Sequence, residues 1–293
     1  MCVSHKICSD NLDLLFGLVK SNIEFGVKTN IIITLADLFN RYPNLLNERV
    51  RDIFMLLHDK EVHVRQQGLM VISHLILNDM LKLKGEIVDI CMLLEDPNDR
   101  IKEQVKLFLH ELHSKGGHII YNLFPKAITR LSKEFESLTK DEFENIAKNL
   151  LTYIKLDTQN QQMIESLCKK LKNSTLPVEW RNTAFCLSQL KLTDKGFMKL
   201  LELYDCYKER LIQSPDVKDY FLIIVQASKR LMKPEMKQHL EDFELKVNLD
   251  ETSILELKQN NPILNAKDEI AKLKKSKQKK GGPVQDVDMD NDG

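Results

Sequence analysis

Apolar and polar positions along the first 115 residues recur with a fixed period of 37 residues. Within each period the apolar residues return every three or four positions, which predicts two amphipathic helices joined by a short acidic turn. The aligned apolar sets include Leu35, Ile72 and Leu109, and also Leu38, Leu75 and Leu112. Self-similarity at this period is typical of stacked repeats, in which each helix pair buries its apolar face only against its neighbours.

The boundaries of the expected helices follow from this periodicity and from capping residues. The first three pairs are expected at 11–21 with 26–39, 45–57 with 61–77, and 85–95 with 98–114, the last helix being capped by Asp96 and Pro97. After a helix at 119–132 the 37-residue register fails, but helices continue at 140–154, from Thr158, at 177–190, at 193–212, from Pro215 and at 234–247. Thr139 with Glu142 and Thr158 with Gln161 are spaced as capping boxes. The expected fold is an all-α, HEAT/armadillo-type α-solenoid.

Three regions are expected along the chain. Residues 11–135 hold the periodic helix pairs, residues 136–249 hold further solenoid helices, and residues 250–293 form a disordered, charged C-terminal tail with a basic run and an acidic end. Such a tail has too few apolar residues to offset its ordering entropy. The first helix is apolar nearly all round, so it should be covered by a partner or by further repeats. We therefore expect the chain to be the C-terminal part of a longer protein.

Composition excludes several classes of protein. The chain has 43 basic and 43 acidic residues, so net charge offers no general attraction to nucleic acid or to a membrane surface. Its six cysteines are scattered without a CxxC pair, which fits free thiols in a reducing compartment. The chain begins without the apolar core of a signal peptide, and no apolar run is long enough to span a bilayer. We expect an intracellular protein.

Signals of catalysis are absent from the sequence. No nucleotide-binding loop, nucleophile elbow or zinc-protease motif occurs. Two groups have a loose metal-like spacing, one formed by Cys2, His5 and Cys8 and the other by His110, His113 and His118. Neither has a complete ligand set, and solvated or packing histidines explain them better. We expect no enzyme activity, no cofactor and no metal.

Two further series repeat with the helices. Asp59 and Asp96 recur in the inter-helix turns, and Arg65 and Lys102 recur early in the following helices. We expect these charges to bond between neighbouring repeats and not to bind a ligand. Gly68 stands where the other repeats have larger residues, which predicts a close approach of two helices.

A basic connection is the best candidate for a functional contact. Lys82 and Lys84 precede Gly85 in a segment that joins two expected helices, where side chains and backbone are accessible to a partner. A wider basic surface would add Lys115, Lys126, Arg130 and Lys133, although interleaved acidic residues favour an ordinary solvated face. In the tail, Lys274, Lys275, Lys277, Lys279 and Lys280 are dense enough for a nuclear import signal, and a solvated basic tail is nearly as good an explanation.

Residues 64–115 with the following IIYNLFPKAITRLS resemble the condensin complex subunit 1 family. The resemblance is most specific in three segments, VISHLILNDMLKLKG, FLHELHSK and IYNLFP. Residues 180–204 are also similar to the family's C-terminal region. Members of this family are several times longer than this chain. They are HEAT-repeat, non-catalytic subunits of condensin I, which acts in mitotic chromosome condensation.

The resemblance implies the partners of the chain. These are the SMC ATPase subunits, the kleisin subunit, DNA or chromatin, and a second HEAT-repeat subunit through the complex. It implies that Lys84 and Gly85, with Lys82, meet an SMC ATPase head, and that the protein acts in the nucleus and on chromosomes, with a cytoplasmic pool as an alternative. Two other functions stay open: another HEAT-repeat adaptor, such as a transport receptor or phosphatase scaffold, and an autonomous nucleic-acid-binding protein.

Overall fold

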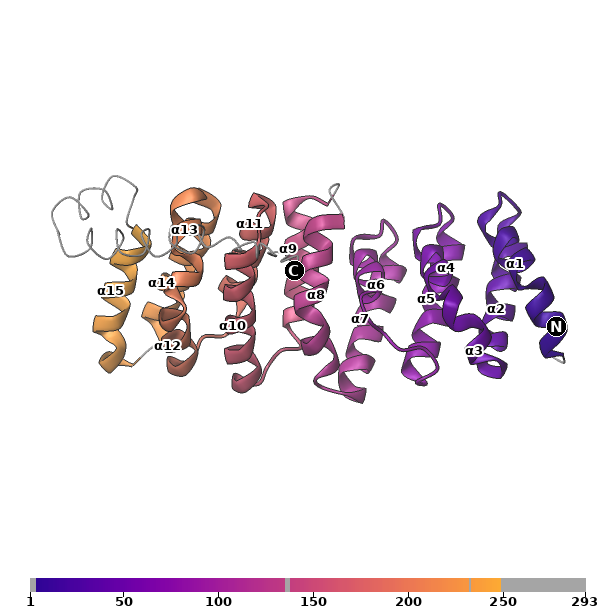
Figure 1. Cartoon of the computed structure of the whole chain (residues 1–293), viewed down its shortest axis with the longest axis horizontal. Helices are drawn as coiled ribbons and strands as arrows, with labels where there is room; N and C mark the ends of the chain where they lie inside the picture. Colours follow the sequence, from indigo (N-terminus) through magenta and orange to yellow (C-terminus); the bar gives the residue numbers. More distant parts are fainter. Residues whose placement is uncertain (1–3, 135–137, 232, 249–293) are drawn as a thin grey trace, which may run out of the picture.

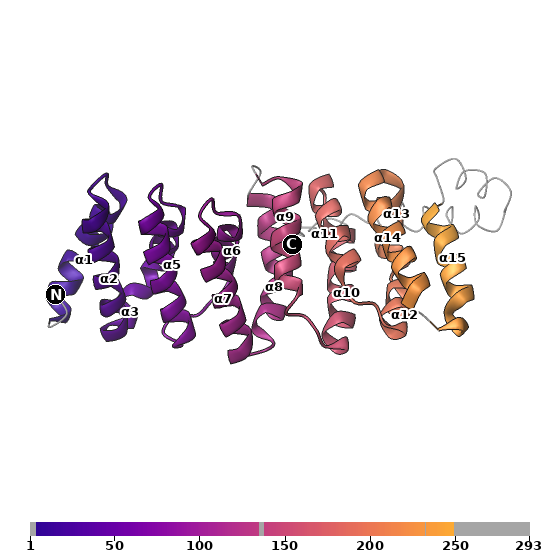
Figure 2. The same cartoon turned by 180° about the vertical axis from the view of Figure 1, so that it is seen from behind.

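Helix pairs stand side by side in one row from α1 to α15 in the computed structural model of the chain (Figure 1). The structure describes residues 4–134, 138–231 and 233–248, and within these ranges it contains no β-strand. The view from behind shows the same single row, with the first and last helices at opposite ends (Figure 2). The expected all-α solenoid is confirmed.

In the first three pairs, the two helices of a pair differ in how continuous they are. The second helix of each pair is one continuous α-helix, whereas the first helices of the second and third pairs are broken into short α and 3₁₀ segments. The elements are α1 (His5–Lys20), α2 (Phe25–Arg41), α3 (Pro43–Leu46), η1 (Asn47–Arg49), α4 (Val50–Phe54), η2 (Met55–His58), α5 (Val62–Leu77), α6 (Ile87–Met92), η3 (Leu93–Glu95) and α7 (Asp99–Lys115).

The later pairs continue the stack with longer helices. They consist of α8 (Ile119–Glu134), α9 (Lys140–Leu151), α10 (Asp157–Asn173), α11 (Pro177–Gln189), α12 (Asp194–Glu202), α13 (Tyr204–Gln213), α14 (Pro215–Leu231), η4 (Pro234–Met236) and α15 (Lys237–Asn248). Among the described residues, no helix is both long enough and apolar enough to cross a membrane.

Helix α7 shows how the sequence specifies these elements. Asn98 caps its first turn, because its side-chain oxygen accepts from the N–H groups of Arg100 and Ile101 at 3.0 and 3.3 Å. Its buried residues, which include Ile101, Val105 and Leu112, return every three or four positions and face the core. Lys115 lies in the last turn, where a positive charge is favourable.

Close helix packing explains Gly68 of α5. A β-carbon added at this glycine would lie 3.0 Å from the Cβ atom of Leu56, which is closer than ordinary side-chain contact. The predicted close approach of two helices at this position is therefore confirmed.

Several expected boundaries are wrong. The first helix begins at His5, capped by Ser4, and not at residue 11. Asn98 is the cap of α7, so Asp96 and Pro97 lie in the preceding turn. The expected cap Thr158 lies inside α10, which begins at Asp157 without a side-chain cap. The capping box of Thr139 and Glu142 is confirmed.

The long helix expected at 193–212 is divided at Leu203 into α12 and α13. Tyr207 of α13 is fully buried, and its hydroxyl donates to the carbonyl oxygen of Leu200 at 2.8 Å. The break lets the Tyr207 ring enter the core, where its hydroxyl joins the N–H of Leu203 in donating to the Leu200 carbonyl oxygen.

The first helix buries only part of its apolar surface. Leu12, Phe16 and Val19 are buried, whereas Leu14 and Ile7 are more than half exposed. The described residues therefore leave one apolar face of α1 open.

Candidate partner-binding surface

Ion pairs join the first three helix pairs to one another. The Nζ atom of Lys28 in α2 lies 2.9 Å from Asp59 in the next inter-helix turn. One repeat later, Arg65 of α5 donates two hydrogen bonds to Asp96, at 2.7 and 3.1 Å. Each pair connects a helix to the turn of the following repeat, so the expected bonds between repeats are confirmed for Asp59, Arg65 and Asp96. The expectation is wrong for Lys102, whose Nζ atom lies 3.5 Å from Asp99 of its own helix.

The pKa of Asp59 reflects this pairing. Burial alone would raise the pKa of its carboxyl group. Hydrogen bonds from the Glu61 N–H and from Lys28, with the positive charges of Lys28 and Arg65, outweigh burial and lower the pKa below its ordinary value. Asp59 is therefore charged at neutral pH, as an ion pair between repeats requires.

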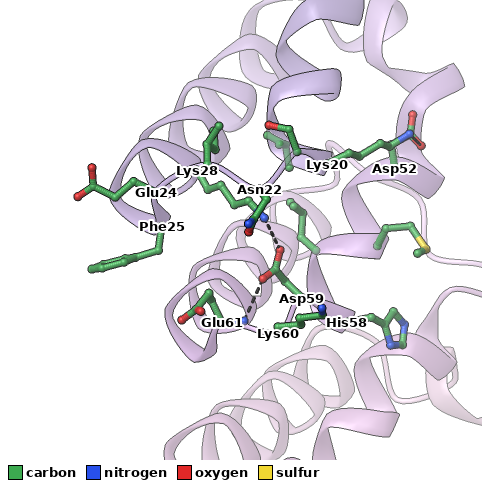
Figure 3. A pocket seen from close by; sticks show the side chains of 15 residues that line it. Lys20, Asn22, Glu24, Phe25, Lys28, Asp52, His58, Asp59, Lys60 and Glu61 are labelled. Carbon is green, nitrogen blue, oxygen red and sulfur yellow. Dashed lines mark hydrogen bonds and ion pairs between the residues drawn. The ribbon is translucent and has the colours of Figure 1, made fainter.

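A groove of about 800 Å³ lies between the turn after α1 and the turn after η2. Figure 3 shows Lys28 crossing it to reach Asp59, while Phe25 points away from the groove. Lys20 and Asp52 form a second pair at its edge, with 2.8 Å between Nζ and Oδ1. Because these four charges neutralise one another, the groove serves the joint between two repeats better than it would serve a charged ligand.

The Lys82–Gly85 connection begins where α5 ends. The N–H of Met80 donates to the Leu75 carbonyl oxygen and the N–H of Asp79 donates to that of Ile76, which is a Schellman motif. Asp79 takes the left-handed position with φ of 61°. The chain is thereby turned out of the helix, and Leu81, only 4% exposed, anchors the segment to the core.

A long-range cluster fixes the far end of this connection. Arg130 of α8 donates to the carbonyl oxygen of Gly85 at 3.0 Å and to both carboxylate oxygens of Asp89 at 2.6 and 3.1 Å. His58 of η2 approaches the same carboxylate, with 3.1 Å between Nε2 and Oδ1. Three successive helix pairs thus meet at Asp89, and Arg130 holds Gly85 in place.

The carboxyl group of Asp89 has a lowered pKa although it is buried. Burial by itself would raise the pKa, but the hydrogen bonds and charges of His58 and Arg130 lower it below the ordinary value. The cluster is therefore held together by charge at neutral pH.

Lys82 and Lys84 are both exposed. In the part of the chain that the structure describes, neither side chain has an ion-pair partner. The N–H of Lys84 donates to the carboxylate of Glu86 at 3.2 Å, which orders the tip of the connection. The structure thus places the two lysines of the candidate site on one ordered, accessible segment.

The fold itself does not require a glycine at position 85. Its φ is not positive, and a β-carbon added there would have no neighbour within 4 Å. The open space above Gly85 faces outward, so a close approach from outside is sterically allowed.

A cleft of about 440 Å³ lies beside Gly85. Arg51 and Met55 of the preceding repeat line it together with Glu86 and Arg130. Met55 is 57% exposed, and Arg51 is exposed with no ion pair among the described residues. The sequence pattern did not reveal these two residues as part of the site, because they lie on a different helix pair and share no motif with the lysines.

The other basic candidates do not form one surface with Lys82 and Lys84. Lys115 bonds to Asp79 and to the Leu77 carbonyl oxygen, and Lys133 lies 3.3 Å from Glu179. Arg130 belongs to the Asp89 cluster, and Lys126 stays exposed on α8. The expectation of an ordinary solvated face therefore fits Lys126 and Lys133, which stay exposed, and is wrong for Lys115 and Arg130, whose side chains are partly buried and bonded within the fold.

The expected nuclear import signal and one of the metal-like groups include residues that the structure does not describe. The basic run from Lys274 to Lys280 lies outside the described residues, as does Cys2. Within the described ranges, no group of three or more His, Cys, Asp or Glu side chains is arranged to hold a metal ion.

The fold defines a class of protein. A single row of stacked helix pairs is the architecture of the HEAT/armadillo-like helical repeat proteins. A family model described as "non-SMC mitotic condensation complex subunit 1" matches residues 26–188. The chain is 37% identical over 248 residues to the condensin-1 complex subunit CAP-D2 of Arabidopsis thaliana, a match that covers 85% of this chain and 17% of that protein.

The human condensin complex subunit 1 is 35% identical over 245 residues, covering 84% of this chain and 17% of that protein. The chain belongs to the condensin complex subunit 1 family. It spans less than one fifth of the length of these relatives. Among solved structures, a designed armadillo repeat protein aligns with 73% of this chain and 98% of its own, with a TM-score of 0.33 and 14% identity.

Proposed function

We propose that the chain is a non-catalytic scaffold segment of a condensin complex and that its Lys82–Gly85 connection docks on an SMC ATPase head. The observation that carries this proposal is the combination of exposed positive charge with a fixed backbone. Lys82 and Lys84 are exposed and have no internal ion pair among the described residues, while Arg130 and Leu81 hold the segment that carries them. An exposed, preorganised basic segment loses little conformational entropy on binding.

The electrostatics of the site favour an acidic partner. The carboxylate of Asp89 is neutralised by Arg130, so it does not oppose the two lysines. Glu86 is the other acidic side chain beside Gly85, and one of its oxygens already accepts the N–H of Lys84. Lys82, Lys84 and Arg51 therefore give this part of the surface an excess of positive charge. Complementary charge on the head would speed association and select the partner.

Other contacts of the complex belong to the same proposal. Kleisin, DNA or chromatin and, through the complex, the second HEAT-repeat subunit are the further partners. We propose the nucleus and chromosomes as the place of action, with Lys274, Lys275 and Lys277 in the import signal. If a reporter fusion with alanine at these three positions stays fully nuclear, the import role is wrong.

Charge reversal tests the docking site. The double variant K82D/K84D should bind a purified SMC ATPase head at least tenfold more weakly in a calorimetric titration. Its melting temperature should stay near that of the wild type, because exposed substitutions usually change stability by less than ~0.5 kcal/mol. Binding to purified kleisin should be unchanged.

A matched control is available in the second half of the chain. Lys155 and Lys191 are exposed lysines in inter-helix connections without an ion pair in the described residues. The variant K155D/K191D changes net charge by the same amount and should keep wild-type affinity for the head. Equal affinity of K82D/K84D and the wild type would mean that the connection is only structural.

Gly85 offers an uncharged test of the same site. The variant G85L should fold normally, because the space around an added β-carbon is open. Its bulk should nevertheless weaken head binding if the partner approaches the backbone at Gly85. Unchanged binding of G85L together with weakened binding of K82D/K84D would limit the contact to the lysine side chains.

A further inference from the structure

Two lysines and one glutamate meet where α8, α10 and α11 pack against one another. Glu179 of α11 is 2% exposed, and its Oε1 atom lies 3.3 Å from the Nζ atom of Lys133 in the last turn of α8. Lys170 of α10 also lies near them, because the charges of Glu179 and Lys133 both act on the pKa of its amine. The side chain of Lys133 is 54% exposed, whereas the Nζ atom of Lys170 is buried. One buried carboxylate therefore has an exposed lysine and a buried lysine as neighbours.

Hydrogen bonding at this junction is incomplete. Within the described residues, neither the Oε1 atom of Glu179 nor the Nζ atom of Lys170 has a hydrogen-bond partner. The contact between Lys133 and Glu179 is close enough for an ion pair but lacks the geometry of a hydrogen bond. A buried charge that lacks hydrogen bonds is costly, so the carboxylate should pair with whichever lysine offers the better partner. The contacts of the junction therefore allow two pairings of one carboxylate.

The other titratable groups around Lys170 leave this balance to the two lysines and the glutamate. Cys186 of α11 acts on the same amine, but burial raises the pKa of its thiol to about 12, so the thiol is uncharged at neutral pH. Arg210 of α13 donates to the carbonyl oxygens of Leu171 and Ser174 at 3.4 and 3.2 Å. Its guanidinium is therefore engaged by the end of α10, and the charge of the junction depends on the other three side chains.

The pKa of Lys170 links the interior of the junction to the charge on Lys133. Burial lowers the pKa of the Lys170 amine to about 8, attraction to Glu179 opposes this effect, and repulsion by Lys133 adds to it. At neutral pH the amine is therefore still mostly protonated and competes with Lys133 for one carboxylate. Loss of the charge on Lys133 would remove the repulsion and free the carboxylate, and both changes raise the pKa of Lys170.

We propose that Glu179 is a counter-ion shared by Lys133 and Lys170, and that the junction is a switch operated by the charge on Lys133. While that charge is present, Glu179 ties α11 to α8. When it is lost, the carboxylate pairs with Lys170 and ties α11 to α10 instead. Acyl transfer from a thioester would operate the switch: the neutral Lys133 amine attacks the acyl carbon, the carbon–sulfur bond breaks, and the amine proton passes to the departing thiolate. This inference does not depend on the proposed contact with the ATPase head.

The titration of Lys170 in the whole chain tests this proposal. NMR of the chain labelled with ¹³C at the lysine ε carbons follows each amine, and K170M identifies the Lys170 signal. K133Q, which resembles the acylated side chain, should raise the midpoint of the Lys170 titration by about one pH unit. K133R keeps the positive charge and should titrate like the wild type. K126Q is the matched control, because Lys126 is an exposed lysine of the same helix, and it should leave the midpoint unchanged.

The variant E179Q separates the shared carboxylate from direct repulsion between the lysines. If Glu179 passes from one lysine to the other, K133Q should shift the Lys170 midpoint less in the E179Q background than in the wild-type background. Equal shifts in the two backgrounds would mean that the lysines only repel each other, and they would overturn the shared counter-ion. A Lys170 midpoint that K133Q does not move would overturn the switch.

Hydrogen exchange covers the case in which E179Q folds poorly. The Nδ2 atom of Asn182 donates to the Oγ atom of Ser132 at 3.0 Å, and this bond between α11 and α8 remains available in K133Q. K133Q should therefore keep the helical content of the wild type, while amide protection falls in the last turn of α8 and rises in α10 near Lys170. The control K126Q should show neither change. Wild-type protection of α8 in K133Q would mean that Glu179 does not hold this helix and would overturn the proposal.

Discussion

The first three helix pairs and the pairs from α9 to α15 stack in the same way but are joined by different chemistry. In the first part, partly buried ion pairs cross between repeats, as in Lys28 with Asp59 and Arg65 with Asp96. In the second part, the rings of buried or nearly buried aromatic residues contact one another. These include Phe143 with Phe185 at 6.3 Å, Phe185 with Tyr220 at 5.5 Å and Tyr207 with Phe221 at 4.6 Å between centroids.

The difference explains why only the first part has a strict period. An ion pair needs its two atoms within about 3 Å, so a change in helix length between repeats would break it. Aromatic rings interact over centroid distances of about 4.5–7 Å in several orientations. Repeats joined by rings can therefore differ in length, and the 37-residue register can lapse while the stack continues.

The largest expected loss follows removal of a central ring from the second part. Phe221 is fully buried and contacts both Tyr207 and Phe243. F221A should lower the free energy of unfolding by ~3–5 kcal/mol through lost burial and a cavity. Native-state hydrogen exchange should show the loss of protection in α11–α15 and not in α1–α5, because repeats couple mainly to their neighbours. I223A, on an exposed face of the same helix, is the control.

A similar loss is expected within the apolar core of the first part. Leu75 of α5 is fully buried at a position that is leucine in each of the three repeats. L75A should destabilise the chain by ~2–5 kcal/mol, and unfolding should begin in the first three pairs. A chemical denaturation midpoint equal to that of the wild type would contradict the repeat alignment.

Breaking one ion pair between repeats should cost about 3 kcal/mol. R65M leaves the Asp96 carboxylate, whose side chain is 3% exposed, without its cation. The double variant R65M/D96N should recover part of this loss, because it removes the uncompensated charge. K169M breaks an exposed pair of α10 and should change stability by less than ~0.5 kcal/mol. An R65M effect as small as that of K169M would show that the inter-repeat ion pairs do not hold the first part together.

The two parts should respond to pH in different ranges, although stability rises with pH in both. In the first part, Asp59 and Asp89 have pKa values below the ordinary 3.8 because ion pairs and hydrogen bonds outweigh burial. Their contribution is present above the unfolded-state pKa and is lost as pH falls below about 4. D89N should flatten this acid limb of a stability profile. If D89N leaves the acid limb unchanged, the cluster around Asp89 does not stabilise the fold.

In the second part, burial of Lys170 lowers the pKa of its amine to about 8. The fold then favours the neutral amine, so the unfolded chain holds more protons between that pKa and the ordinary 10.5, and stability should rise as pH increases through this window. Denaturant titrations between pH 7.5 and 9.5 should show this rise for the wild type and not for K170M. A parallel profile for the two proteins would contradict a buried, unpaired amine.

The smallest changes in stability are expected at two helical glycines, Gly17 and Gly68, and they should have opposite signs. Nothing lies within 4 Å of a β-carbon added at Gly17, so G17A should stabilise the chain by ~0.5–1 kcal/mol through helix propensity. At Gly68 the added carbon would press on Leu56, and G68A should destabilise by ~1 kcal/mol or more. Melting temperatures that shift in the same direction would contradict the tight contact between α5 and the preceding helix.

How far the sequence predicts this molecule depends on how local each feature is. The helix pairs and the bonds from Lys28 to Asp59 and from Arg65 to Asp96 follow from a repeating pattern, because equal spacing in sequence becomes equal position in the stack. The junction of Arg130 with Asp89 and Gly85 could not be predicted, because it joins separate pairs 41 and 45 residues apart that share no period. The break between α12 and α13 at Leu203 could not be predicted either, because Tyr207 has the spacing of an ordinary buried helix residue.

Hydrogen exchange of the chain with and without a purified SMC ATPase head tests the central claim most directly. That claim is that the ordered connection after α5 is the docking site for the head. The account predicts new protection from exchange in residues 79–86 and in the neighbouring α4 and η2, with α9–α15 unchanged. Protection confined to α9–α15, or none at residues 79–86 while the head is bound, would contradict it.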